Sequence, residues 1–317
     1  MPAPKTLREQ EALADRGFEC VSSCDYKGAL RIAERLKKSR YTACFEIAAL
    51  AYAGMAQMEE AVGVLKEGTA IAPDVWVNWE LLGNYLSDLG RYEEAENALQ
   101  HAMECPGAWI ASISLNMAVL ESRKGNLEEC LNILLDIDDP EVELPAAAIR
   151  ISVLEDLGRN EDVKTQASEL LAREFGDDAD LEPLARICAS LGNVWLLEGR
   201  DTAEIRTMLK EALDYDVCCF AILDLIRKID GRPGPNAYVY RCLVDFTGDF
   251  GDMCAKGYCS TFDVIAEDEQ QAANLIKAHE DSPLIRKMRV LEKARGDHMP
   301  GEALGIYSRG PRMFYKK

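Results

Sequence analysis

Apolar and small residues recur along the first two thirds of the chain at spacings of three and four, the pattern of amphipathic helices. A glycine, or another residue in its place, precedes an acidic segment at positions 24, 56, 90, 125, 158 and 199, so the gaps are 32, 34, 35, 33 and 41 residues. A period near 34 with helical spacing predicts stacked pairs of helices. The six segments are SCDYKGALRIA, AQMEEAVGVL, LGRYEEAENAL, KGNLEECLNIL, LGRNEDVKTQA and EGRDTAEIRTML.

Two units of this repeat share a detailed arrangement of small and large apolar residues. Small residues let paired helices approach closely, and large ones fill the space between them. Trp79 is followed at offsets of 3, 4, 7, 16, 20 and 23 by Leu82, Gly83, Leu86, Ala95, Leu99 and Ala102. Phe45 is followed by Ala48, Ala49, Tyr52, Ala61, Leu65, Gly68 and Pro73. These units resemble the tetratricopeptide repeat, and weaker units begin at Leu13, Ser114, Ala147 and Cys188.

The resemblance covers about residues 8–215 and implies a mainly α fold, a solenoid of about six helix pairs. A single unit cannot bury its own apolar face, so the units share one elongated core. We expect the solenoid to span residues 1–230, with the apolar segment 217–230 as a closing helix. The sequence GRPGPN at 231–236 interrupts the pattern and predicts a linker.

Residues 237–317 have a different periodicity and predict a small α+β domain, for which we identify no family. Strands are expected at Tyr238–Thr247, Tyr258–Ala266 and Met288–Arg295. A helix is expected over EDEQQAANLIKAHE, which begins at Glu267. The segment LGIYSRGPRMFY, from Leu304, predicts a hairpin that turns at Arg309-Gly310-Pro311. The expected domain is an antiparallel sheet with one helix.

The charge is distributed unevenly between these two parts. The chain has 36 basic and 55 acidic residues, a net charge of −19, which argues against a general nucleic-acid binder. Residues 236–317 hold 12 basic and 12 acidic side chains, so residues 1–235 carry the whole excess. Within the tail, residues 286–317 have nine basic and three acidic residues. The chain is therefore an acidic solenoid followed by a domain that ends in a basic segment.

The resemblance implies a peptide-binding scaffold whose concave surface is lined by the first helix of each pair. One version in the family clamps a partner's terminal carboxylate with Lys, Asn and Arg, but Glu46, Glu80 and Asp88 have the wrong sign for that clamp. An acidic groove suits a peptide or a basic protein surface instead. The alternative is that these positions are only solvated polar residues. The groove positions expected to contact a partner are Glu46, Glu80, Asn84, Asp88, Arg123, Ser152 and Glu155.

The sequence favours a non-enzymatic scaffold without a cofactor, because it lacks a glycine-rich phosphate loop, HExxH and GxSxG. The C-terminal domain leaves alternatives open: a ligand-, metal- or RNA-binding module, or a catalytic one built on Cys259 and His279. Its basic segment docking into the acidic groove is an intramolecular alternative. Zinc ligands could come from Cys242, Cys254, Cys259, His279 and His298, although no CxxC pair is present. RNA contacts could come from Arg286, Lys287, Arg289, Arg295, Arg309, Arg312 and Lys316 with Tyr307, Phe314 and Tyr315.

Cysteine usage and the apolar runs bear on localisation. The 11 cysteines are an odd number, and most lie in helical patterns beside Ala and Leu, which indicates reduced thiols in a core. The start, MPAPKTLREQEALADRG, has no apolar core of a signal peptide. No stretch reaches the roughly 18 apolar residues of a membrane span. We therefore expect a cytoplasmic protein with no membrane contact.

Overall fold

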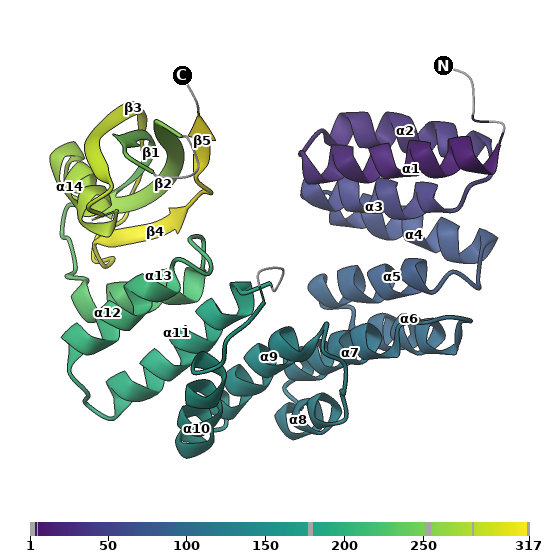
Figure 1. Cartoon of the computed structure of the whole chain (residues 1–317), viewed down its shortest axis with the longest axis horizontal. Helices are drawn as coiled ribbons and strands as arrows, with labels where there is room; N and C mark the ends of the chain where they lie inside the picture. Colours follow the sequence, from purple (N-terminus) through teal and green to yellow (C-terminus); the bar gives the residue numbers. More distant parts are fainter. Residues whose placement is uncertain (1–3, 5, 177–179, 251–254, 281, 316–317) are drawn as a thin grey trace. The chain divides into compact units, whose positions relative to one another are not determined.

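A computed structural model of the chain describes residues 4, 6–176, 180–250, 255–280 and 282–315. The chain forms two compact units, residues 1–153 and 154–317. The described residues contain six successive helix pairs, one further helix and a sheet domain (Figure 1). The helices are α1 (Leu7–Ser22), α2 (Tyr26–Lys38), α3 (Ala43–Gly54), α4 (Met58–Ile71), α5 (Trp76–Asp88), α6 (Tyr92–Glu104), α7 (Ile110–Lys124), α8 (Leu127–Leu135), α9 (Glu143–Asp156), α10 (Asn160–Leu171), α11 (Glu182–Leu197), α12 (Thr202–Ala212) and α13 (Phe220–Asp230).

The six residues that mark the repeat in the sequence lie between the two helices of each pair and share one backbone conformation. The four glycines among them have φ between 70° and 83°. Cys24 and Ala56, which replace glycine in the first two pairs, have φ of 60° and 58°. A positive φ brings Cβ close to the following carbonyl oxygen, so only glycine adopts it without strain. The repeat period therefore reflects a residue with left-handed backbone conformation that recurs between the two helices of each pair.

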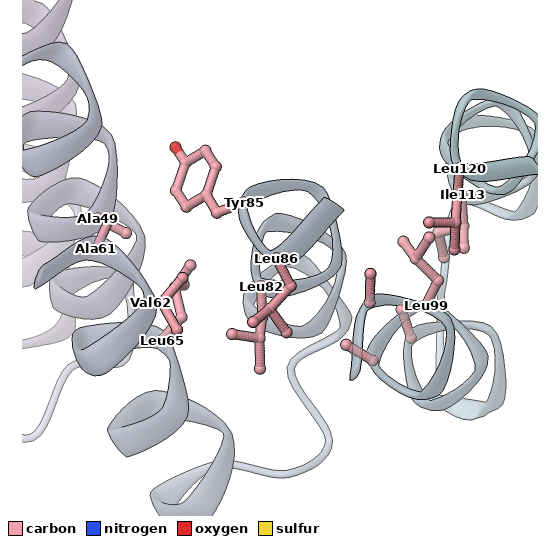
Figure 2. Close-up of a cluster of buried hydrophobic side chains, with 13 residues drawn as sticks. Ala49, Ala61, Val62, Leu65, Leu82, Tyr85, Leu86, Leu99, Ile113 and Leu120 are labelled. Atoms are coloured by element: carbon pink, nitrogen blue, oxygen red, sulfur yellow. The ribbon is translucent and has the colours of Figure 1, made fainter. Parts of the chain in front are cut away.

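The core of the first unit runs continuously from one helix pair to the next. Figure 2 shows Ala49, Ala61, Val62 and Leu65 of α3 and α4 on one side of α5, and residues of α6 and α7 on the other. No pair closes its own core, because each buries its apolar face against the following repeat. The other labelled members of this cluster are Leu82, Tyr85, Leu86, Leu99, Ile113 and Leu120.

Close helix approach within a pair depends on Gly83 of α5. A Cβ atom at this position would lie 2.6 Å from Cγ of Leu99 and 3.2 Å from the carbonyl oxygen of Ala95, both on α6. Leu99 and Ala95 are fully buried. The leucine thus occupies the space that a larger residue at position 83 would need, as the small-and-large pattern of the sequence predicts.

In the second unit, α13 belongs to two apolar cores. Its residues Ile222 and Leu225 pack with α11 and α12. Leu223 packs instead with Phe262 and Val264 of the sheet domain, and α13 lies beside β4 (Gly305–Arg309) in Figure 1. One helix therefore joins the last helix pair to the sheet.

The sheet domain contains the predicted strands and helix. Its elements are β1 (Tyr238–Gly248), β2 (Gly257–Ala266), α14 (Glu269–His279), β3 (Ile285–His298), β4 and β5 (Met313–Tyr315). The strand order is β3-β1-β2-β4, all neighbouring pairs are antiparallel, and β5 also pairs with β2. Tyr240 and Val244 of β1 lie on the face that packs with Ile276 of α14. The chain thus has helical repeats followed by a small antiparallel sheet domain.

The predicted hairpin in Leu304–Tyr315 is wrong. Both β4 and β5 pair with β2, opposite Phe262 and Tyr258, so the chain continues along one edge instead of turning back. Between them, the N–H of Gly310 donates to the carbonyl oxygen of Thr261 (2.8 Å), and Ser260 Oγ donates to the carbonyl oxygen of Gly310 (2.7 Å). Pro311 has no N–H, so it interrupts the ladder without reversing the strand.

The shared turn conformation predicts opposite effects of two substitutions. Ala56→Gly should raise the free energy of unfolding by up to about 1 kcal/mol, because it relieves a left-handed alanine. Gly90→Ala should lower the free energy of unfolding by about 1 kcal/mol, although a Cβ there meets no atom within 4 Å. Urea unfolding followed by circular dichroism measures both, and shifts of equal sign would contradict this account of the turn.

The Gly83–Leu99 contact predicts a non-additive pair of substitutions. Leu99→Ala should lower the free energy of unfolding by about 2–5 kcal/mol, because it leaves a cavity. Gly83→Ala should destabilise the native chain through its clash with Leu99, but should be nearly neutral in the Leu99→Ala background. Gly63→Ala, at an α4 position where a Cβ meets nothing within 4 Å, is the control and should be slightly stabilising. Additive losses at positions 83 and 99 would contradict the contact.

Candidate functional site

The first helices of successive pairs in the first unit, α1, α3, α5 and α7, pack side by side. This arrangement brings together five of the residues that the sequence analysis placed in a groove. We call Glu46, Glu80, Asn84, Asp88 and Arg123 the first-helix row; Glu46 comes from α3, Arg123 from α7 and the others from α5. On α5 they follow one another at four-residue spacing, so they lie along one side of that helix.

Glu80 is buried, with 8% of its surface exposed. Its Oε1 accepts hydrogen bonds from Ser112 Oγ (2.6 Å) and Asn116 Nδ2 (3.0 Å), both on α7. Burial raises the pKa of Glu80, although these two hydrogen bonds act in the opposite direction. The carboxylate is therefore held by neutral groups, and its ionised form is disfavoured relative to water.

Glu46 is half-buried on α3, beside Glu80. Burial raises the pKa of Glu46, and the negative charge of Glu80 raises it further. Burial also raises the pKa of Tyr85 to about 12, reinforced by Asp88 and Glu46. The pKa shifts of Glu46 and Tyr85 thus both include repulsion from neighbouring carboxylates.

At the other end of the first-helix row, the carboxylate of Asp88 is already paired with an arginine. Arg123 Nη1 lies 2.6 Å from Asp88 Oδ1 and donates to Ser87 Oγ at 2.9 Å. Asn84 is half-buried between Glu80 and Asp88. Asp88 therefore has a cation beside it, whereas no cation among the described residues contributes to the pKa shifts of Glu46 and Glu80.

Carboxylates on the second helices of the pairs have a different environment. Lys37 on α2 pairs with Glu67 on α4 (2.7 Å), and Lys66 on α4 pairs with Glu94 on α6 (2.9 Å). Arg91 also pairs with Glu94 (2.7 Å). In the described part of the chain, no cation contributes to the pKa shifts of Glu46 or Glu80.

The last two predicted groove residues are not shown to join this row. Ser152 is exposed near the end of the first unit, and Glu155 belongs to the second unit. Burial raises the pKa of Glu155, opposed by hydrogen bonds from Ser190 and Asn193 of α11. The Glu–Ser–Asn arrangement of Glu80 thus occurs a second time, between α9 and α11.

Sequence reasoning missed Ser112, Asn116 and Tyr85. Ser112 and Asn116 follow Glu80 by 32 and 36 residues, close to one repeat period. The sequence signal for Ser112 and Asn116 is that both are polar and follow the first-helix residue Glu80 by about one repeat period. Tyr85 was hidden because it lies among the apolar positions of α5 and is itself buried.

The proposed zinc ligands do not converge. Cys242 faces the core with Phe262, whereas Cys259 lies opposite Asp245 on the other face of the sheet. His279 is buried at the end of α14, where it contacts Glu280 and Phe262, and the ring of His298 lies 4.6 Å from that of Tyr238. Cys254 lies outside the described residues. Within the described residues, no three His, Cys, Asp or Glu side chains are grouped to hold a metal ion.

Most of the basic residues considered for RNA have partners inside the sheet domain. Arg289 lies 3.4 Å from Asp245, and Arg286 lies 3.3 Å from Asp249. Arg295 stacks 3.4 Å above the ring of Tyr238. Arg309 and Arg312 both face Glu280, Lys287 is exposed, and Lys316 lies outside the described residues. The basic charge of this segment is therefore largely used within the domain.

Known proteins identify the architecture of the helical part. No family model matches the sequence, and no curated protein matches it. Among solved structures, a tetratricopeptide repeat protein from Parabacteroides merdae has a TM-score of 0.56 at 15% identity, covering 71% of this chain and 86% of that one. PilW, a widely conserved type IV pilus biogenesis factor, has a TM-score of 0.56 at 16% identity, covering 70% of this chain and 100% of its own.

A chain of the APC/C hetero-tetramer Cut9–Hcn1 has a TM-score of 0.54 at 12% identity, covering 70% of this chain and 43% of that one. Among the described residues, no helix has both the length and the apolar character needed to cross a bilayer. At these identities the likeness concerns the fold. The helical part of this chain is an array of tetratricopeptide-type repeats.

Proposed function

We propose that the repeat array is a non-enzymatic scaffold that binds another protein, and that the first-helix row receives a basic segment of that partner. One observation carries this proposal. Glu46 and Glu80 are neighbouring carboxylates, both withdrawn from water, and no cation contributes to their pKa shifts in the described residues. The likeness to PilW, a biogenesis factor, and to the Cut9–Hcn1 assembly supports a role in protein association.

A lysine or arginine of the partner would supply the charge that Glu46 and Glu80 lack. Bringing a cation next to a poorly solvated carboxylate gains more than the same contact at the surface, because water screens it less. Asn84 can donate to and accept from a peptide backbone beside it. The Asp88–Arg123 pair bounds the row, so the basic residue is directed toward Glu46 and Glu80.

An external partner is favoured over docking of the chain's own basic segment. Arg289, Arg295 and Arg309 already contact Asp245, Tyr238 and Glu280 within the sheet domain. Releasing them would break those contacts before any new ones form. We further propose a cytoplasmic location, supported by thiols such as Cys44 and Cys130 that are buried as core residues.

Glu80→Gln should make the protein at least as stable at pH 7 as the native chain. Because its pKa is raised above the ordinary 4.5, Glu80 contributes fully to stability only below about that pH. The contribution is lost as pH rises through the folded-state pKa. Glutamine keeps an acceptor for Ser112 and Asn116 but carries no charge. Thermal unfolding between pH 4 and pH 8 should therefore show a flatter profile for the variant.

Glu94→Gln is the matched control. Hydrogen bonds from Lys66 and Arg91 lower the pKa of Glu94, so its contribution is present above the ordinary pKa and is lost as pH falls. This variant should therefore be slightly less stable than the native chain at pH 7. If Glu80→Gln is instead clearly less stable at pH 7, Glu80 has a structural role and the argument for a binding role weakens.

Peptides selected from a displayed random library on the full chain should be rich in lysine and arginine. Their affinity should fall at least tenfold in Glu46→Gln/Glu80→Gln, which corresponds to about 1.4 kcal/mol for loss of charge-assisted contacts. Fluorescence anisotropy with one selected peptide measures this change. Glutamine is used because a lysine at buried position 80 would unfold the repeat.

Glu67→Gln/Glu94→Gln changes the net charge by the same amount on the second helices and is the control for this binding experiment. Its affinity for the selected peptide should stay within about twofold, since both glutamates already pair with lysines. Equal losses in both variants would mean that only the overall negative charge attracts the peptide. Selected peptides without a basic bias would contradict the proposal directly.

A further inference from the structure

A cavity of about 260 Å³ lies within the second unit, among α12, α13 and the sheet domain. Its walls come from α12, α13, the second half of α14 and the start of β4 with the segment before it. Small-molecule sites are mostly apolar, carry a few fixed polar groups and measure about 300–1,000 Å³. This cavity is slightly smaller than that range, so a ligand that fits it is small.

Aliphatic side chains form most of the apolar lining. Leu223 of α13 and Ile306 of β4 are buried. Ile226 of α13, Leu275 of α14 and Leu304 before β4 line the same cavity but are only half-buried. Side chains from three elements thus face one space without filling it, and part of their apolar surface stays in water. Covering that surface with a hydrocarbon group is favourable.

Three cationic side chains line the cavity, and two of them already have partners. Arg206 Nε of α12 donates to Asp230 Oδ2 of α13 (2.9 Å). Arg227 Nη1 of α13 donates to the carbonyl oxygen of Ile306 (2.6 Å), and its Nη2 donates to Asp224 Oδ1 (3.0 Å). The two arginines therefore hold α12, α13 and β4 around the cavity, and their charges are matched within the domain.

Lys210 of α12 is the third cation and is exposed. Its Nζ lies 3.5 Å from the carbonyl oxygen of Ala278, another lining residue, and it forms no ion pair with the described residues. Glu211 and Asp214 are near it in the sequence but do not line this cavity. Asp230, the carboxylate in the described lining, is already paired. The ammonium of Lys210 is thus the unmatched charge of this lining.

His279 also lines the cavity but adds no positive charge at pH 7. Burial lowers its pKa to about 4; Glu280 opposes that shift, whereas Arg309, Lys210 and Arg312 reinforce it. The imidazole is therefore neutral and does not repel the ammonium nearby. The cavity combines an aliphatic lining with a single unmatched cation.

We propose that this cavity binds an aliphatic carboxylate of medium chain length, with its hydrocarbon chain against Ile226, Leu275 and Leu304 and its carboxylate at Lys210. One negative charge matches the one free ammonium, because both arginines are paired. An amide of the same chain length would keep the apolar contacts but lose the ion pair. A short carboxylate would keep the ion pair but lose the apolar contacts. This site lies outside the first-helix row and is independent of the function proposed for it.

The test is isothermal titration of the full chain with octanoate, hexanoate, butyrate and octanamide. Octanoate should bind with one site per chain. Hexanoate should bind about 15-fold more weakly, because each buried CH₂ contributes about 0.8 kcal/mol, or about fourfold. Octanamide should bind about fivefold more weakly, the upper range for a partly exposed ion pair. Equal binding of octanoate and butyrate, or of octanoate and octanamide, would overturn the proposal, as would no binding of octanoate at about 10 mM.

Two variants separate the charge from the cavity. Lys210→Gln should weaken octanoate about fivefold and leave octanamide unchanged, because it removes only the ion pair. Ala278→Leu should weaken both ligands, since its larger side chain occupies part of the space. Lys210 and Ala278 are exposed, so both variants should fold, and their unfolding temperatures verify this. Unchanged binding in Ala278→Leu, or equal losses of octanoate and octanamide in Lys210→Gln, would refute the site.

Lys277→Gln is the matched control, because Lys277 is an exposed lysine of α14 that does not line the cavity. It changes the net charge by the same amount as Lys210→Gln and should bind octanoate as the native chain does. Equal weakening in the two lysine variants would mean that only the overall charge attracts the carboxylate, and the assignment of Lys210 would be wrong.

Discussion

A helix pair of this repeat cannot cover its own apolar face, and the rest of the first unit follows from that constraint. Each pair is stable only when the next one packs against it, so α3 to α7 contribute to one continuous core. Continuous packing requires close approach, and Gly83 against Leu99 shows how little space remains between the helices. Substitutions at such contacts act on two helices at once, which makes the repeat sequence restrictive at a few positions and tolerant at most others.

The same close packing creates the unusual polar surface beside the core. When first helices lie side by side, a long acidic side chain on one is pressed against the next, as Glu80 is against Ser112 and Asn116. Neutral donors satisfy its hydrogen bonds but do not restore the solvation of its charge. On the second helices, glutamates such as Glu67 remain exposed and meet lysines. Glu67 on a second helix thus meets a cation at the surface, whereas burial disfavours the charged forms of Glu46 and Glu80 in the first-helix row.

The difference between local features and contacts from distant segments explains which parts of the structure the sequence could predict. The period and the turn positions are local properties of backbone and side-chain size, so they could be read directly, even at Ala56, where glycine is replaced. The hydrogen-bond partners of Glu80 could not be predicted, because they come from another repeat and depend on how the helices pack. The hairpin prediction failed for a related reason: Gly310-Pro311 looks like a turn in isolation, but β2 offers a continuous edge that the chain follows instead.

The Glu280–Arg309 pair shows that a buried polar contact in the second unit need not add to its stability. Both side chains leave water almost completely, and the desolvation of such a pair commonly cancels its attraction. An apolar pair of similar volume would join the end of α14 to β4 at least as well, as Ile276 and Ile306 already do in the adjoining core. Arg309 moreover keeps one nitrogen without a partner among the described residues. A buried ion pair that is costly to desolvate and incompletely satisfied therefore holds these two elements together without adding much to the stability of the fold.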